Sequence, residues 1–147
     1  MKLTEHFHLD EFTKSDTAAR MDYTEQYEPS EEVLDNLKFL AQELENVRHL
    51  LGHPILISSG YRCLRLNRHL GSRDTSKHVL GKAVDFTSKA GTPEEIVRRI
   101  VNSDIEYDQI ILEYDRWVHL AFTQDNPRKE SLIIDNNGVR PFENIIT

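Results

Sequence analysis

The chain has 147 residues and a formal net charge of −7, and it is long enough for a single domain, residues 1–147, with a real hydrophobic core. The acidic balance argues against nucleic acid or an anionic membrane as the main partner, because both attract basic surfaces. Cys63 is the only cysteine, which excludes an internal disulfide and a cysteine-based structural zinc site.

The N-terminal segment carries no recognisable targeting signal. No apolar run of signal-peptide length occurs there, and no stretch of the chain approaches a membrane span. We therefore expect synthesis in the cytoplasm without an export signal, and no membrane partner. Residues 1–29 are expected to be an irregular segment packed on the body of the domain. Short helical turns are expected at Leu9–Phe12 and after Ser15, and a loop at 22–29.

A long helix is predicted between Ser30 and Gly52. Ser30 is a typical N-cap, and the glycine is typical of a helix end. Apolar residues recur between them at steps of three and four, which predicts one buried face. That face consists of Val33, Leu37, Leu40, Leu44, Val47 and Leu51. We expect this helix to be the main helical part of the core.

Two short strands with a helix between them are predicted next. Pro54–Ser59 is typical of a strand, and Tyr61–Leu70 is predicted to be a short helix. A polar loop then leads to the strand Lys82–Thr87, in which apolar and other residues alternate. Asp85 falls on the side of this strand that faces away from its apolar side, so we expect its carboxylate to face a cleft.

The remaining elements complete an α+β fold. Thr92–Glu95 is a strong helix start, with a threonine cap, proline first and glutamate third, and it predicts a helix over 93–102. Three strands are predicted to follow, over 108–114, 118–123 and 131–134, with a turn at Asn137-Gly138. We expect a small, mainly antiparallel sheet with both longer helices on its apolar face and the cleft on the other.

The register of the 108–123 hairpin is predicted from its apolar faces. Both faces need the core, so their residues should lie opposite each other. The expected pairs are Ile110 with Phe122, Leu112 with Leu120, and Tyr114 with Val118. This register makes 115–117 the loop and places Glu113 directly across from His119.

Two imidazoles and one carboxylate are candidate metal ligands. His78 and Asp85 lie seven residues apart, and His119 lies on a later strand. Zinc favours such ligands, and three of them leave a fourth position for water. Glu113 is the candidate general base, and Asp115 is a second candidate. From the spacing alone, a hydrogen-bonded histidine and a capping or surface aspartate are the simpler interpretation.

Three motifs resemble those of the zinc D-alanyl-D-alanine peptidases. Ser76–Asp85 resembles the signature Ser-x-His-x-x-Gly-x-Ala-x-Asp, Ser58–Arg62 resembles the Ser-Gly-Tyr-Arg segment, and Trp117–His119 resembles the C-terminal Trp-x-His. The chain is similar in particular to short, single-domain members from phages and prophages. Their chains open with segments like Phe7–Phe12 and Ser15–Arg20.

The resemblance implies a hedgehog/DD-peptidase-like fold and one zinc ion per chain, held by His78, Asp85 and His119. It implies hydrolysis of peptide bonds in peptidoglycan stem peptides, of the carboxypeptidase or the endopeptidase (endolysin) type. The essential acid of some members lies three residues before the last histidine, where this chain has Arg116. In the short phage members and in hedgehog domains it lies six before, where this chain has Glu113.

The resemblance also suggests roles around the metal. Arg62 resembles the arginine that stabilises charge on the scissile carbonyl, and Ser76 resembles a serine that hydrogen-bonds substrate. Tyr61 and Trp117 are expected to form walls of the cleft. Simpler roles are a surface salt bridge for Arg62, a loop cap for Ser76 and ordinary packing for the two aromatic residues.

Two other functions fit the same motifs. One is a non-enzymatic, zinc-containing binding module, which would be favoured if Glu113 were turned away from the metal ligands. The other is a component of a phage virion. The expected partner is a peptidoglycan peptide, and the expected site of action is the bacterial cell wall, reached through lysis machinery or a virion. The oligomeric state is left open.

Overall fold

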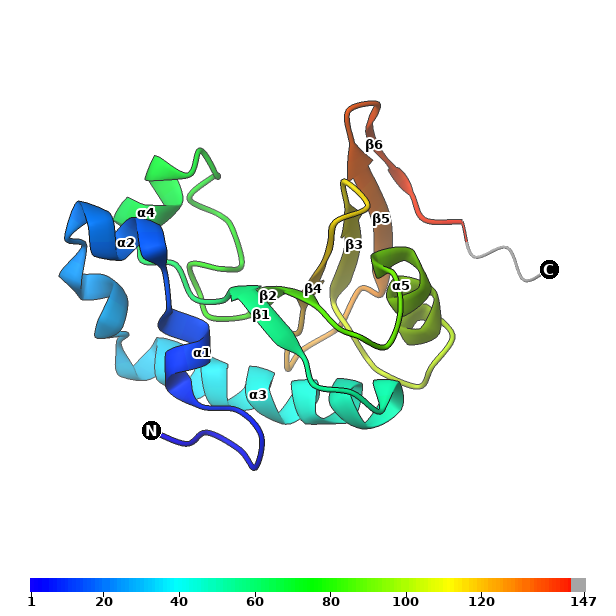
Figure 1. The fold of residues 1–147 in the computed structure, drawn as a ribbon, viewed down its shortest axis with the longest axis horizontal. Helices are drawn as coiled ribbons and strands as arrows, with labels where there is room; N and C mark the ends of the chain where they lie inside the picture. The colour runs from blue at the N-terminus through cyan, green and yellow to red at the C-terminus, as the bar shows by residue number, and fades with distance from the viewer. Residues whose placement is uncertain (144–147) are drawn as a thin grey trace.

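The computed structural model describes residues 1–143, which form six strands, five α-helices and one short 3-10 helix (Figure 1). In chain order the elements are α1 (Leu9–Thr13), α2 (Asp16–Met21), η1 (Thr24–Tyr27), α3 (Glu31–Leu51), β1 (Leu56–Ser59), α4 (Leu64–His69), β2 (Ala83–Thr87), α5 (Pro93–Val101), β3 (Gln109–Glu113), β4 (Trp117–Ala121), β5 (Glu130–Asp135) and β6 (Gly138–Pro141). Within the described residues, no helix is both long and apolar enough to cross a membrane.

The six strands form one sheet in the order β1-β2-β4-β3-β5-β6. Every neighbouring pair is antiparallel except β3 and β5, which run parallel. The predicted α+β class with a mainly antiparallel sheet is therefore confirmed. Because β4 pairs with both β2 and β3, two separate parts of the chain, β2 and the β3–β4 hairpin, meet at the centre of the sheet.

The two longer helices begin at the residues that the sequence indicates. Helix α3 also ends as predicted, and α5 ends one residue before the predicted end at 102. The Ser30 hydroxyl accepts the N–H of Val33, and Gly52 ends α3 with a positive φ of 71°. Thr92 and Glu95 cap α5 reciprocally, since each side chain accepts a backbone N–H of the other residue. Such caps satisfy N–H groups that have no partner within the helix.

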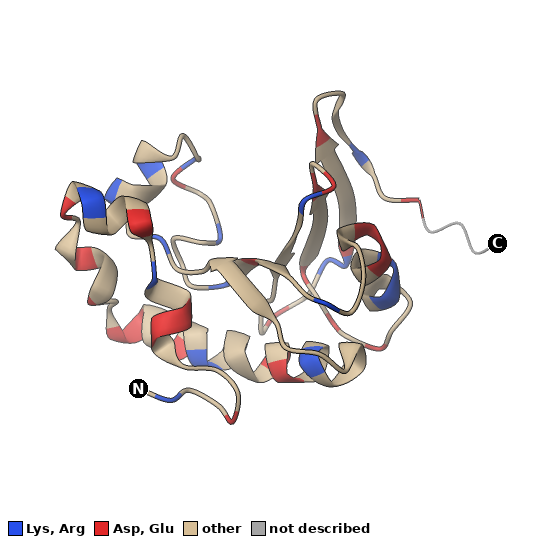
Figure 2. Cartoon of the chain, viewed as in Figure 1, with Lys and Arg blue, Asp and Glu red and all other residues tan. Residues whose placement is uncertain are grey.

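The core lies between these helices and one face of the sheet. Six of its strand residues, each at most 4% exposed, are Val84, Phe86, Ile110, Leu112, Val118 and Leu120. Leu37, Leu40, Leu44 and Val47 of α3 and Ile96, Val97 and Ile100 of α5 pack in the same cluster. Figure 1 shows α3 along the lower side of the molecule, with α2 and α4 at the opposite end from α5. Acidic and basic side chains are interspersed along α3 and around α2 and α4 (Figure 2).

The N-terminal segment is more ordered than predicted. The turns expected at Leu9–Phe12 and after Ser15 are confirmed as α1 and α2, and Ser15 caps α2 by accepting the N–H of Ala18. The loop predicted over 22–29 is wrong in part, because Thr24–Tyr27 forms the 3-10 helix η1. Gln26 of η1 is fully buried, and its side chain bonds to other segments, a non-local cause that local composition does not show.

Helix α4 begins three residues later than the predicted start at Tyr61. Residues 60–63 instead form an extended loop. The N–H of Tyr61 bonds to the carbonyl of Phe12, and the N–H of Arg62 bonds to the carbonyl of His78. These bonds hold residues 60–63 against other parts of the chain, and the helix starts after Cys63, its N-cap.

The predicted register of the β3–β4 hairpin is wrong by two residues. Ile110 pairs with Leu120, Leu112 pairs with Val118, and Glu113 pairs with Trp117 rather than with His119. The cause is the turn, which is one residue further back than expected. Tyr114 and Asp115 have φ values of 54° and 56°, and the N–H of Arg116 bonds to the carbonyl of Glu113. Two consecutive left-handed residues are typical of the tight turns that join antiparallel strands.

The strand predicted over 131–134 is confirmed, and a further strand, β6, which was not predicted, follows the turn. The strand expected over 131–134 is β5, and the turn at Asn137-Gly138 leads into β6. The N–H of Asn137 bonds to the Asp135 side chain, and Gly138 has a φ of 102°, which glycine adopts without steric cost. The parallel pairing of β5 with β3 extends the sheet beyond the hairpin.

Candidate metal centre and active site

His78, Asp85 and His119 lie together and are buried, with exposures of 3%, 7% and 8%. One ligand atom from each lies within 4.8 Å of those of the other two. Asp85 of β2 is the direct cross-strand partner of His119 of β4, so the sheet itself brings these two side chains side by side. His78 enters from the turn before β2. The structure thus brings all three predicted ligand residues to one point.

The distances from Asp85 to the two imidazoles are close to those expected around a tetrahedral zinc ion. Asp85 Oδ1 lies 3.3 Å from His78 Nε2 and 3.0 Å from His119 Nδ1. Two ligand atoms bound at zinc–nitrogen or zinc–oxygen distances of about 2.0–2.1 Å in a tetrahedral site lie about 3.3–3.4 Å from each other. The nitrogen and oxygen donors are also the types that zinc prefers, so residues and ion match in chemistry and in spacing.

The ring of His78 is oriented by the backbone. Its Nδ1 lies 2.7 Å from the carbonyl oxygen of Gly60, which can only accept, so Nδ1 carries the proton and Nε2 offers its lone pair towards Asp85. Burial lowers the pKa of His78, and Asp85 opposes this effect. The imidazole is therefore neutral near pH 7, the state that binds a metal ion.

Asp85 is held as a carboxylate. Burial by itself would raise the pKa of its carboxyl group, but the nearby imidazoles of His119 and His78 outweigh this and bring the pKa well below the ordinary value. Its second oxygen, Oδ2, accepts from Arg62 Nη2 at 3.4 Å. One oxygen of Asp85 thus faces the two imidazoles, and the other faces a guanidinium.

Glu113 lies beside the three ligand residues. Its Oε1 is 4.0 Å from His119 Nδ1, and its side chain is 21% exposed. Burial raises the pKa of Glu113, the negative charge of Asp85 raises it further, and His119 acts in the opposite direction. A carboxylate of raised basicity at the edge of the group is suited to proton transfer near neutral pH.

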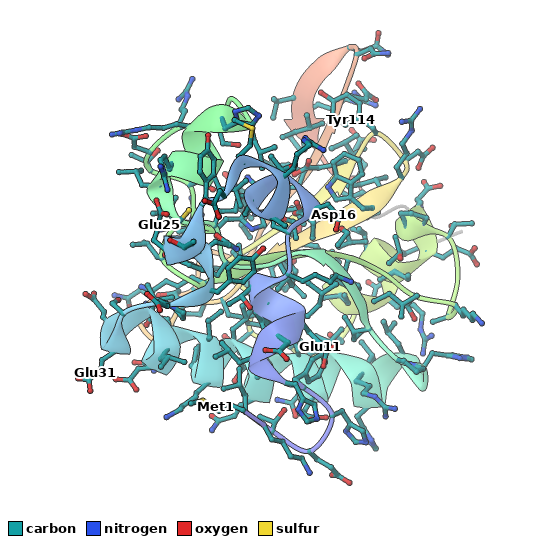
Figure 3. All side chains as sticks on the ribbon, turned by 60° about the vertical axis from the view of Figure 1, so that its left-hand side comes forward. Met1, Glu11, Asp16, Glu25, Glu31 and Tyr114 are labelled. Carbon is teal, nitrogen blue, oxygen red and sulfur yellow. The ribbon has the colours of Figure 1, made fainter. Side chains whose placement is uncertain are left out.

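Asp115, the second candidate base, lies elsewhere. It is exposed at the tip of the β3–β4 hairpin, next to Tyr114, which Figure 3 shows at the end of that hairpin. Asp115 lines a hollow of about 730 Å³ together with Leu112 and Ile133, which belong to the helix-covered side of the sheet. This geometry favours Glu113 over Asp115 for work at the ligand group.

Arg62 is held more firmly than a surface arginine, its side chain being only 12% exposed. Its Nε donates to Ser59 Oγ at 3.1 Å. Its Nη1 donates to Asn67 Oδ1 at 3.4 Å and to Ser72 Oγ at 3.2 Å. Burial lowers the pKa of Arg62, whereas the carboxylates of Asp85 and Glu113 raise it. The guanidinium therefore faces both carboxylates of the centre, which a surface salt bridge would not do.

The other three predicted site residues have structural contacts. Ser76 Oγ accepts the N–H of His78 at 3.3 Å, which is the contact of a loop cap. Tyr61 packs between the main core and a small cluster around Cys63, and burial raises its pKa. Trp117 is half-buried, with its ring centre 6.0 Å from that of Tyr114. These contacts do not test their predicted roles towards substrate.

Sequence reasoning did not find two fully buried amides, Gln26 and Asn67. Asn67 accepts from Arg62 and donates to the carbonyl of Arg73 at 2.8 Å. Gln26 bonds to the backbone on either side of Arg62. Both residues lie in polar stretches that are typical of surfaces, and no local pattern distinguishes them from exposed amides.

Comparison with known protein families identifies a relationship that covers most of the chain. The family model described as Peptidase M15 matches residues 5–121, which include every residue of the centre described above. No curated protein matches the chain significantly.

Proposed function

Because the chain belongs to the Peptidase M15 family, a family of zinc metallopeptidases, we propose that it hydrolyses peptide bonds in the stem peptides of peptidoglycan. The observation that carries this proposal is the buried group of two imidazoles and one carboxylate with the Glu113 carboxylate at its edge. The likeness of its motifs to those of D-alanyl-D-alanine peptidases supports a bond that involves D-alanine.

His78, Asp85 and His119 would hold the zinc ion. In this place zinc supplies a Lewis acid, which polarises the substrate carbonyl and makes water a stronger nucleophile at neutral pH. The neutral state of His78 and the ionised state of Asp85 are the states that ligation requires.

Glu113 is the residue that moves the proton. Its carboxylate, made more basic by burial, accepts a proton from the attacking water and then gives it to the leaving amine. Its position also discriminates between the two kinds of function. A Glu113 turned away from the ligand residues would favour a non-enzymatic binding module, whereas its Oε1 lies 4.0 Å from His119 Nδ1, which favours a hydrolase.

Arg62 stabilises the negative charge that develops on the carbonyl oxygen. A guanidinium has five N–H donors, and the contacts to Ser59, Asn67, Ser72 and Asp85 use four of them. One Nη2 donor remains for substrate within the described structure. A fixed donor that needs little reorganisation is effective in this role.

The bond and its location follow from the same likeness. We propose action at the bacterial cell wall, either on a terminal D-alanine as a carboxypeptidase or on a cross-link as an endopeptidase of the endolysin type. Both reactions need the same ligand set, base and arginine, so they differ only in how the substrate extends from the centre.

Mass spectrometry of digested peptidoglycan tests this function. Zinc-loaded protein is incubated with purified peptidoglycan, and the His119→Ala variant serves as the control. Release of D-alanine would show a carboxypeptidase, and opened cross-links would show an endopeptidase. Muropeptides that are identical with wild-type and control protein would refute hydrolysis of peptidoglycan.

A further inference from the structure

The loop that carries Arg62 is held from two sides. On one side its backbone meets the loop of His78: the carbonyl of Gly60 accepts from His78 Nδ1, and the N–H of Arg62 bonds to the carbonyl of His78. On the other side it meets the N-terminal segment, where the N–H of Tyr61 bonds to the carbonyl of Phe12 at 2.7 Å. The loop therefore links the N-terminal segment to the metal centre.

Gln26 completes the contact on the N-terminal side. Its Nε2 donates to the carbonyl of Tyr61 at 2.7 Å, and its Oε1 accepts the N–H of Cys63 at 2.8 Å. One amide thus holds the residues directly before and after Arg62. The second N–H of the same nitrogen donates to the carbonyl of Thr13 at 2.9 Å. Gln26 is 0% exposed, so water cannot replace these bonds.

We propose that Gln26 is a positioning residue for Arg62. It fixes the backbone of Arg62, while Asn67 and the serines Ser59 and Ser72 fix the guanidinium at the other end of the side chain. The inference rests on the proposed role of Arg62 in hydrolysis. Through Gln26 the N-terminal segment, which contributes no metal ligand, sets the position of Arg62.

The chemistry of the amide explains why glutamine stands here. Two carbonyl oxygens and one N–H converge on the position, and an amide offers two donors and one acceptor in a fixed geometry. Methionine has a similar length but would leave all three backbone groups unpaired. Glutamate would keep the acceptor for Cys63 but would direct an oxygen at two carbonyl oxygens. Both substitutions should release the Arg62 backbone.

A double-mutant cycle tests the proposal. The variants Gln26→Met, Arg62→Ala and the double variant are compared on a peptidoglycan-derived pentapeptide, with zinc content and circular dichroism recorded for each. We expect Gln26→Met to bind zinc normally and to lower kcat about 10- to 100-fold, with a smaller change in KM. In the Arg62→Ala background it should lower kcat no further, because its effect acts through Arg62.

A neighbouring residue provides the matched control. Glu25 also lies on η1 (Figure 3). It forms an exposed ion pair with Arg65 of α4, with contacts of 2.6 and 2.7 Å, and its side chain is not hydrogen-bonded to the Arg62 loop. Glu25→Gln perturbs the same short helix, and we expect kcat to be unchanged. If Gln26→Met does not fold, Gln26→Glu takes its place in the cycle, since it preserves the volume and one of the bonds.

The outcomes separate the hypotheses. Equal losses of kcat in both backgrounds, or no loss from the Gln26 variant, would overturn the positioning role. An inactive zinc-loaded wild type would overturn the proposed function, and an Arg62→Ala variant with full activity would overturn the role of the arginine. Each of these results is distinct from the loss of coupling expected here.

Discussion

The Oε1 atom of Glu113 lies 4.0 Å from Nδ1 of His119, although the residue directly across the ladder from Glu113 is Trp117. The two side chains are diagonal neighbours on one face of the sheet. Diagonal neighbours in a sheet remain within reach of long side chains. The Glu113 carboxylate can therefore reach the metal centre although Glu113 and His119 are not directly paired across the two strands.

Replacement of Glu113 should separate metal binding from turnover. We expect Glu113→Gln to retain about one zinc per chain and to lower kcat about 100- to 10,000-fold, because the amide cannot accept the proton. Zinc content and kcat measured on the same preparation check this expectation. Asp115→Asn, in the exposed turn, is the matched control and should leave kcat unchanged. The opposite result for the two variants would assign the base to Asp115.

Loss of either imidazole should remove the metal. His78→Ala and His119→Ala are each expected to reduce zinc from about one ion per chain to nearly none, because two donors do not hold the ion against dilution. Elemental analysis after dialysis measures this. His49→Ala, at an exposed position near the end of α3, should bind zinc like the wild type. Full zinc content in the His78 variant would show that the ion lies elsewhere.

The Asp108–Arg128 pair should make stability depend on pH. Asp108 is 5% exposed and accepts three N–H groups of Arg128 at 3.1–3.2 Å, and these bonds hold its pKa below the ordinary value. A lowered pKa in the folded state means that the stabilisation is complete above the ordinary aspartate pKa of about 3.9 and is lost as the pH falls through the folded pKa.

Arg128→Gln tests that contribution. We expect it to lower the free energy of unfolding by about 1.5 kcal/mol near neutral pH and by progressively less as the pH falls below the ordinary aspartate pKa of about 3.9, as measured by urea denaturation. The exposed pair Arg68–Asp74 provides the comparison, and Arg68→Gln should leave the free energy of unfolding almost unchanged, because solvent screens the pair. An Arg128→Gln deficit that is constant with pH would contradict the assignment.

The turn of the β3–β4 hairpin offers a stabilising substitution. Tyr114 adopts a φ of 54°, which disfavours a bulky side chain and is well tolerated by asparagine. Tyr114→Asn is expected to raise the free energy of unfolding by about 0.5–1 kcal/mol, less what the contact with the Trp117 ring contributes. Thermal unfolding measures this. The similarly exposed Tyr27, which has no positive φ, is the control, and Tyr27→Asn should give no gain.

The hairpin also shows how far sequence patterns reach. Alternation predicted correctly which residues of β3 and β4 face the core, because a shift by two residues leaves every side chain on its own face. The absolute register depended on the turn, and the pair Tyr114-Asp115 lacks the glycine or asparagine that marks left-handed turns. Glu113 was predicted to lie near His119, and it does so despite the wrong register, because a shift by two residues keeps both side chains on the same face of the sheet.

The metal-ligand residues could be predicted from the sequence, whereas the buried amides that hold Arg62 and its loop could not. His78, Asp85 and His119 stand in motifs with characteristic residues and spacing, so their convergence could be predicted. Gln26 and Asn67 act through backbone groups far away in the chain or through the guanidinium of Arg62. Such contacts exist only in the folded chain, and an amide in a polar stretch carries no local mark of burial.

Gly60 is the point at which the N-terminal segment packs against the loop next to the metal centre. A Cβ atom at this position would lie 2.7 Å from the carbonyl oxygen of Phe12, so the α1 backbone occupies the space of a side chain. Glycine lets the N-terminal residues sit directly against the loop that orients His78. A shortened chain that began at α3 would expose this loop to water and leave its hydrogen bonds to solvent. The N-terminal segment is therefore part of the packing that holds the loop of Gly60 and, through it, the ring of His78.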